Sequence, residues 1–184
     1  SSEPVQVSEP VTVVVSQKGY VRCRTGHGHD AKLMSYKQGD GYLWSAECES
    51  TETLIVCGSN GRTYSVPVSQ LPSARGDGLP ITSFIELETG SEIVGYLAGP
   101  DNGVMLYTTE GFGLACSLKN LVARVRSGKA FMSVGEEAVM CPPVVLTEGT
   151  QYVACMAQDG RLLVFTLEEL RTLAGGGKGV TLMG

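Results

Sequence analysis

The feature that most constrains the fold of this chain is a tight glycine turn that recurs four times. The turns lie at Gly19, Gly61, Gly111 and Gly160, which are 42, 50 and 49 residues apart. Each turn joins two short runs rich in β-branched and apolar residues, a pattern typical of β-hairpins. A period of roughly 40–50 residues with about four strands per repeat predicts blades arranged around an axis.

The three later repeats share features beyond the turn. Ten residues after each of their turn glycines stands a leucine: Leu71, Leu121 and Leu170. A glycine-containing segment follows further on, at 75–78, 127–129 and 175–179. The first repeat keeps the hairpin but has His29 at the leucine position, so we expect its connection to differ.

Alternating or continuous apolar runs predict the individual strands. They are expected at 11–15, 20–24, 42–47, 53–57, 62–66, 81–87, 92–98, 103–107, 113–116, 152–156 and 161–165. Residues 119–125 and 167–173 could each form a single helical turn, and no stretch predicts a long helix. Residues 1–9 are polar and are expected to be a linker remnant. We therefore predict one all-β domain over residues 10–184, with about four blade repeats.

The composition agrees with a globular, turn-rich chain. Hydrophobic residues make up 42% and charged residues 18%, with 24 glycines and 8 prolines, which disfavours disorder. The six cysteines form no CxxC pair, which indicates buried thiols in a cytoplasmic protein and argues against disulfides or a metal site. They are Cys23, Cys48, Cys57, Cys116, Cys141 and Cys155. No run is long enough to span a membrane, no signal peptide precedes the first strand, and the start at Ser1 suggests a fragment.

Charge is segregated along the chain, although the net charge of −5 by itself argues against a nucleic-acid partner. Residues 111–135 carry four basic residues and no acid, whereas residues 76–118 carry six acids and no Lys or Arg. Residues 10–39 carry five basic residues and one acid, and Arg22 and Arg24 are expected to point outward from their hairpin. A basic arc can therefore coexist with an acidic total, and phosphate neutralisation requires only the arc.

Several phrases resemble the C-terminal β-pinwheel domains of bacterial type IIA topoisomerase A subunits, and in particular their topoisomerase IV branch. The phrases are EPVTV at 9–13, GRTY at 61–64, LPSARG at 71–76, LVAR at 121–124 and MCPPVV at 140–145. Gyrase A subunits carry a Gln-Arg-Arg-Gly-Gly-Lys-Gly box. The nearest match here, at 174–179, lacks the Gln and both Arg, which favours topoisomerase IV and disfavours tight DNA wrapping.

The resemblance implies a propeller-like disc of four-stranded antiparallel blades, each exchanging a strand with its neighbour. Five or six blades are usual in the family, so an open or truncated disc is expected. The resemblance further implies a non-catalytic domain whose basic rim binds and bends duplex DNA without sequence preference, and which guides substrate choice during decatenation and supercoil relaxation. Its implied partners are duplex DNA and, in the full ATP-dependent enzyme, the rest of the topoisomerase IV A chain and the B chain; we expect no cofactor, no membrane contact and a monomeric fragment.

The predicted DNA-contacting residues are the basic residues of the hairpins, connections and glycine segments. They are Lys18, Arg22, Arg24, Arg62, Arg75, Lys119, Arg124, Arg126, Lys129, Arg161, Arg171 and Lys178. One alternative is a propeller-like protein-interaction module that does not bind DNA. A second alternative is a small β enzyme.

Other chemical signals are weak. The segment 27–30 holds two histidines and an aspartate, but without paired cysteine ligands it is expected to be an ordinary loop. The run at 172–179 departs from a phosphate-binding loop, because Thr172 replaces the first glycine and Gly179 replaces the Ser or Thr. No local Ser–His–acid or Cys–His set is evident. None of the seven tyrosines has the sequence context of the strand-cleaving tyrosine in topoisomerase A subunits.

Overall fold

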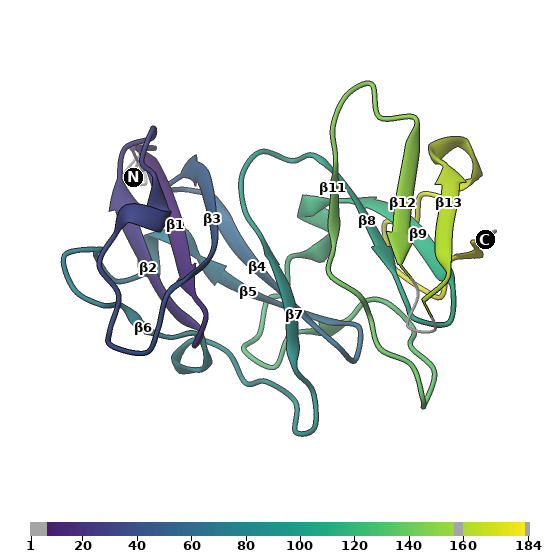
Figure 1. The fold of residues 1–184 in the computed structure, drawn as a ribbon, viewed down its shortest axis with the longest axis horizontal. Helices are drawn as coiled ribbons and strands as arrows, with labels where there is room; N and C mark the ends of the chain where they lie inside the picture. Colours follow the sequence, from purple (N-terminus) through teal and green to yellow (C-terminus); the bar gives the residue numbers. More distant parts are fainter. Residues whose placement is uncertain (1–6, 157–159, 183–184) are drawn as a thin grey trace, which may run out of the picture.

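Four β-hairpins form the framework of the computed structural model, which describes residues 7–156 and 160–182 (Figure 1). The hairpins are β1 (Pro10–Ser16) with β2 (Tyr20–Thr25), β4 (Thr53–Gly58) with β5 (Arg62–Pro67), β8 (Gly103–Tyr107) with β9 (Phe112–Ser117), and β12 (Tyr152–Met156) with β13 (Leu162–Thr166). All four turn glycines have φ between 84° and 90°, a left-handed backbone that glycine adopts without a Cβ penalty. The predicted hairpins are confirmed.

Two further strands complete each of the first three hairpins into a four-stranded antiparallel sheet. An edge strand pairs with the first hairpin strand: β3 (Tyr42–Glu49), β7 (Ile93–Leu97) or β11 (Val144–Leu146). A two-residue strand pairs with the second: β6 (Leu79–Pro80), β10 (Lys129–Ala130) or β14 (Val180–Thr181). Because β6, β10 and β14 each come from the repeat that follows, every one of these blades receives a strand from its neighbour. The fourth sheet, within the described residues, contains β12 and β13.

A single 3-10 turn follows each of the four hairpins, and a fifth such turn follows β6. These turns are η1 (Ala31–Leu33), η2 (Val68–Gln70), η3 (Ile81–Ser83), η4 (Leu118–Leu121) and η5 (Leu167–Glu169). The expected single turns near 119–125 and 167–173 are confirmed by η4 and η5. The expected strand over 81–87 is wrong, because after the two-residue strand β6 the chain turns into η3 and then a loop. Its apolar pattern arises because Ile81 and Ile85 are buried in the core and Phe84 and Leu87 pack against it, while Thr82 and Ser83 are exposed.

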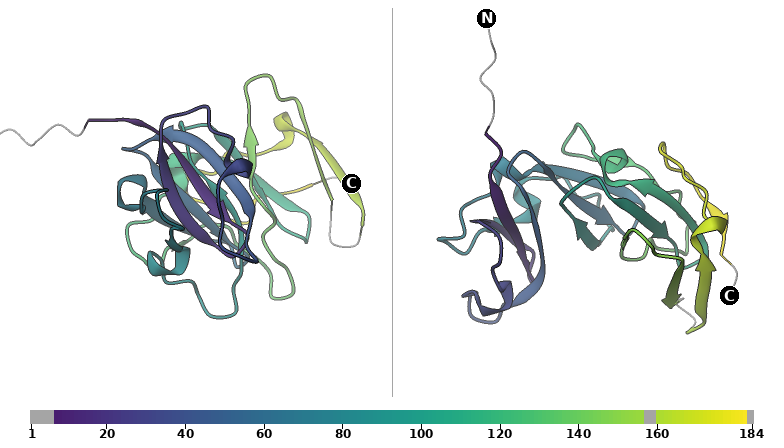
Figure 2. Two further views of the ribbon diagram at one scale, coloured as in Figure 1. Left: turned by 60° about the vertical axis from the view of Figure 1, so that its left-hand side comes forward. Right: turned by 90° about the horizontal axis from the view of Figure 1, so that it is seen from above.

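The core lies between successive blades, in three clusters. The first joins blade 1 to blade 2 through residues such as Val13, Val56 and Tyr64. The second joins blades 2 and 3, and the third packs Met105 of blade 3 against Val153 and Cys155 of β12. Since hairpin residues alternate between two faces, a central blade buries both, and β4 sends Leu54 and Val56 one way and Ile55 and Cys57 the other. The blades follow one another along an open arc (Figure 2), which confirms the β-pinwheel architecture. Of the predicted linker, residues 1–6 lie outside the described residues.

Each exchanged strand is preceded by a connector, which we define as residues 71–78, 122–128 and 170–179. A connector glycine lies directly over a backbone carbonyl of the preceding blade. Gly78 lies over Val21, Gly128 over Thr63 and Gly179 over Gly113, and all three have positive φ. A Cβ at any of them would overlap that carbonyl oxygen. The glycine-containing segments at 75–78, 127–129 and 175–179 therefore allow each connector to pass close to the strand of the preceding blade.

Candidate nucleic-acid interface

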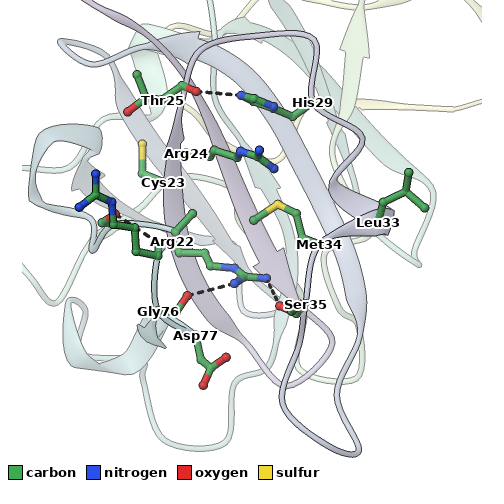
Figure 3. Close-up of a pocket in the computed structure, with 13 residues that line it drawn as sticks. Arg22, Cys23, Arg24, Thr25, His29, Leu33, Met34, Ser35, Gly76 and Asp77 are labelled. Atoms are coloured by element: carbon green, nitrogen blue, oxygen red, sulfur yellow. Dashed lines mark hydrogen bonds between the residues drawn. The ribbon is translucent and has the colours of Figure 1, made fainter.

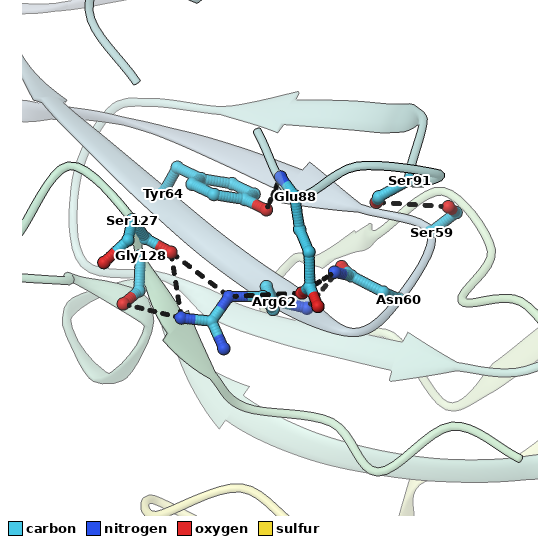
Figure 4. A network of polar contacts seen from close by, with 8 residues as sticks. All are labelled: Ser59, Asn60, Arg62, Tyr64, Glu88, Ser91, Ser127 and Gly128. Atoms are coloured by element: carbon cyan, nitrogen blue, oxygen red, sulfur yellow. Dashed lines mark hydrogen bonds and ion pairs between the residues drawn. The ribbon is translucent and has the colours of Figure 1, made fainter. Parts of the chain in front are cut away.

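The second connector is pinned to β5 and presents two arginines to solvent between its fixed ends. At its start, the Thr63 hydroxyl donates to the Leu121 carbonyl at 2.8 Å, and the Ala123 N–H donates to the Ser65 hydroxyl at 2.7 Å. At its end, the Arg62 guanidinium donates to backbone carbonyls (Figure 4). Between these points, residues 124–127 are exposed. Arg124 and Arg126 are therefore displayed on a short segment whose backbone is held.

The first connector is held on β2 in a similar way. The Cys23 N–H donates to the Pro72 carbonyl at 2.8 Å, and the Ala74 N–H donates to the Cys23 carbonyl at 3.0 Å. Arg75, directly after Ala74, is exposed. The third connector repeats this pattern, since the Ala115 N–H of β9 donates to the Arg171 carbonyl at 3.0 Å. Successive blades thus present connector arginines next to their second hairpin strand.

Two hollows lie where the first and second connectors cross these strands. The first, of about 710 Å³, is lined by Arg22 and Arg24 of β2 (Figure 3) and by Arg75 of the connector. The second, of about 370 Å³, is lined by Arg124 and Arg126 and by no acidic residue. Both hollows place guanidinium groups beside a strand edge, where an extended anionic backbone can approach.

Nine of the twelve basic residues predicted to contact DNA are exposed. They are Lys18, Arg24, Arg75, Lys119, Arg124, Arg126, Arg161, Arg171 and Lys178. Some of these make weak contacts within the chain. Lys119 lies 3.5 Å from the Asp101 carboxylate in an exposed pair, the Arg126 guanidinium donates to the Ser83 carbonyl at 3.1 Å, and the Lys178 ammonium lies 4.1 Å from the Phe112 ring centroid.

The other three predicted residues face into the molecule. Arg22 is only 4% exposed, so the expectation that it points outward is wrong. Its guanidinium donates to the Gly76 and Ser35 carbonyls, at 3.0 and 2.6 Å, and lies 4.9 Å from the centre of the Tyr36 ring. A buried guanidinium needs such partners, because leaving its donors unpaired costs far more than the hydrogen bonds gain.

Arg62 and Lys129 are half-buried. The Lys129 ammonium donates to the Asn120 carbonyl and lies near the Phe131 ring, while Arg62 belongs to the network of Figure 4. The alternation of side chains along the strand predicts that Arg22 points outward. The sequence around an arginine does not indicate whether its guanidinium will bind carbonyl groups of the next repeat. Thr63 and Ser65, which hold the second connector, likewise have no sequence signature of that role.

The cysteines and histidines do not form a reactive or metal-binding site within the described residues. All six cysteines are free thiols, five of them buried and Cys23 half-buried, as predicted. Burial raises the pKa of Cys57 to about 12, and burial also raises the pKa of Cys48 to about 12, so neither is a thiolate near neutral pH. The ring nitrogens of His27 and His29 each lie within 2.9 Å of a backbone carbonyl oxygen, those of Cys48 and Thr25. Within the described residues, no group of three His, Cys, Asp or Glu side chains could hold a metal ion.

A membrane-spanning helix is not found in the described part of the chain. The 3-10 turns are too short to enter a DNA groove as a recognition helix. What the exposed connectors offer is a row of cationic donors on a β framework. Such a surface can bind phosphate groups without reading bases.

Comparison with known proteins identifies relatives with the same architecture. A family model described as "DNA gyrase C-terminal domain, beta-propeller" matches residues 52–95 and 151–184. The A chain of DNA topoisomerase 4 from Haemophilus influenzae is 36% identical over 177 residues, which cover 96% of this chain and 24% of that protein. Its counterpart in Escherichia coli K12 is 37% identical over 170 residues, covering 92% of this chain and 23% of that protein. The chain thus spans about a quarter of these relatives' length.

Among solved structures, the chain matches one titled "Structure of the E. coli ParC C-terminal domain" with a TM-score of 0.86 and 36% identity. The match covers 96% of this chain and 72% of that one. The family model and the solved structure are both described as C-terminal domains. The sequence likeness, the blade exchange and the open arc agree: the chain belongs to the C-terminal β-pinwheel domains of topoisomerase IV A subunits.

Proposed function

We propose that this chain is a non-catalytic domain that binds duplex DNA along the row of connector arginines. The observation that carries the proposal is that each of the three connectors carries at least one exposed arginine, namely Arg75, Arg124, Arg126 or Arg171, at differing positions along it. All four are exposed and lie on connectors that are bound to consecutive blades. Because the connectors repeat with the blades, a ligand that contacts all of them must itself be extended and repetitively charged. Duplex DNA is such a ligand.

The chemistry of the row suits phosphate. A guanidinium offers planar paired donors that match two phosphate oxygens. The second hollow contains no carboxylate to compete with them. The acids of the segment 76–118 include Glu88 and Glu92, which lie beside the turn of the second hairpin. A local excess of positive charge is compatible with a net charge of −5, since screening limits the reach of each charge to about 10 Å at moderate salt.

In the whole enzyme, this domain would hold and bend a DNA segment and thereby guide which segment is passed during decatenation and relaxation. Its partners there would be the rest of the topoisomerase IV A chain and the B chain, in the bacterial cytoplasm at the nucleoid. The domain would need no cofactor for this task, because phosphate binding by arginine requires none.

The proposal is tested with Arg124→Gln/Arg126→Gln, measuring affinity for a linear duplex of mixed sequence at several salt concentrations. Loss of two phosphate contacts should weaken binding and reduce the slope of log affinity against log salt by about 2. The matched control is Lys32→Gln/Lys37→Gln, which removes the same charge from exposed positions in η1 and in the loop that follows it. The control should retain the wild-type slope.

Equal affinity and slope in the connector variant and the wild type would contradict DNA binding at this row. An absence of binding by the wild-type chain at low salt would instead favour the protein-interaction module.

A further inference from the structure

Arg62 is part of a polar network that joins β5 to the second connector. Its Nε donates to the Ser127 carbonyl at 3.1 Å, and one terminal nitrogen donates to the Ser127 and Gly128 carbonyls at 2.9 and 3.1 Å (Figure 4). The Glu88 carboxylate lies 3.8 Å from Nε and accepts a 2.7 Å hydrogen bond from the Asn60 amide. The guanidinium is therefore engaged on two sides, by backbone carbonyls and by a carboxylate.

The two carbonyls that Arg62 binds lie directly after the exposed arginines of the connector. Upstream, Thr63 and Ser65 of the same strand bind Leu121 and Ala123. Three residues of β5 thus fix both ends of a segment in which Arg124 and Arg126 are the exposed cations. With its ends fixed, the segment loses less conformational entropy when its side chains engage a ligand.

Blade 1 contains a similar device. There Arg22 donates to the Gly76 carbonyl, directly after the exposed Arg75. In two successive blades, therefore, an inward-facing arginine of the second hairpin strand, Arg22 or Arg62, donates to a connector carbonyl close after an exposed arginine. This recurrence argues against an accidental contact.

Building on the proposed function, we propose that Arg62 is a positioning residue for DNA binding: it fixes the connector that presents Arg124 and Arg126 and does not itself contact phosphate. Only 25% of its side chain is exposed. An arginine suits this role because its planar fork reaches two carbonyls at once, which the single ammonium of lysine does not reproduce.

The proposal predicts that geometry at position 62 matters more than charge. Arg62→Gln and Arg62→Lys should both weaken duplex binding by about three- to tenfold, because each loosens the connector. Lys37→Gln, which removes one exposed charge elsewhere, should retain wild-type affinity. If Arg62→Lys restores full affinity, charge suffices and the positioning role is wrong.

A double-mutant cycle separates positioning from direct contact. In the Arg124→Gln/Arg126→Gln background, Arg62→Gln should cause no further loss of affinity and no further change of salt slope. An additional slope decrease of about 0.9 in that background would identify Arg62 as a phosphate contact and overturn the proposal.

Trypsin supplies a readout that does not depend on DNA. Cleavage after Arg124 and Arg126 should be slow in the wild type and several-fold faster in Arg62→Gln, while thermal unfolding confirms that the variant remains folded. Unchanged cleavage would show that Arg62 does not hold the second connector in place. If Arg62→Gln speeds cleavage but the Arg124→Gln/Arg126→Gln variant binds DNA like the wild type, Arg62 holds the connector and the proposed function is wrong.

Discussion

Replacing Gly128 by alanine tests the physical basis of the strand exchange. Gly128 has φ of +71°, and an added Cβ would lie 2.8 Å from the Tyr64 ring and closer still to the Thr63 carbonyl oxygen. Neither neighbour can yield easily, because Thr63 pairs with both Cys57 and Lys129 in the sheet, and Tyr64 is fully buried. The substitution therefore combines an unfavourable backbone conformation with a steric overlap.

The two costs can be separated with a matched control. The left-handed backbone costs an L-residue about 1–2 kcal/mol, and overpacking at a rigid site adds about 1–3 kcal/mol. Gly111 has φ of +90° but no atom within 4 Å of an added Cβ, so Gly111→Ala incurs only the first cost. The entropy that alanine removes from the unfolded chain is common to both variants. Gly128→Ala should therefore be less stable than Gly111→Ala by about 1–3 kcal/mol.

Urea denaturation of the two variants and the wild type measures this difference, with thermal melting as a second probe. At about 2–4 °C per kcal/mol for a chain of this size, the melting temperatures of the two variants should differ by roughly 2–12 °C. Equal destabilisation of both variants would refute the argument, because it would mean that the close approach of connector and strand has no energetic consequence.

Three further outcomes follow from the core and its thiols. Leu114→Ala, at a fully buried site between blades 2 and 3, should cost about 2–5 kcal/mol in urea denaturation, and a loss below about 1 kcal/mol would contradict the two-sided packing. Cys57 should resist a thiol reagent in the native state and react on unfolding, as followed by absorbance; native reactivity at the rate of a free thiol would show that the site opens. Burial raises the pKa of Cys57 from 9.0 to about 12, so the folded state holds the proton more tightly than the unfolded state. The contribution of Cys57 to stability should hence be constant below about pH 8 and fall between about pH 9 and 12, and a Cys57→Ala variant should lack that part of the fall.

The hairpins were predictable because their determinants are local. A glycine that can adopt positive φ between two β-branched runs is enough to predict a hairpin turn. Asn60-Gly61 is the clearest example. The repeat spacing then predicted the blade architecture. The expectation of buried thiols holds for five of the six cysteines, and Cys23 is half-buried.

The exchanged strands were not predictable in the same way. Lys129–Ala130 is too short to show a period, and it forms a strand only because Arg62 and Thr63 of another repeat lie opposite. Residues 81–87 show the converse error, because their alternation is produced by packing of a 3-10 turn and loop against the core. Short elements take their structure from partners distant in the chain.

By itself, the sequence determined the four hairpins, the repeat and the family to which the chain belongs. Only the tertiary structure decided which cations face solvent. Arg22 and Arg24 are separated by one residue, yet the first is buried and binds two carbonyls while the second is exposed. The physical reason is that the role of an arginine depends on whether acceptors lie within reach of its guanidinium. Some of those acceptors, such as the carbonyls of Gly76 and Ser127, lie on connectors that come from the next repeat, and others, such as that of Ser35, come from a loop of the same repeat.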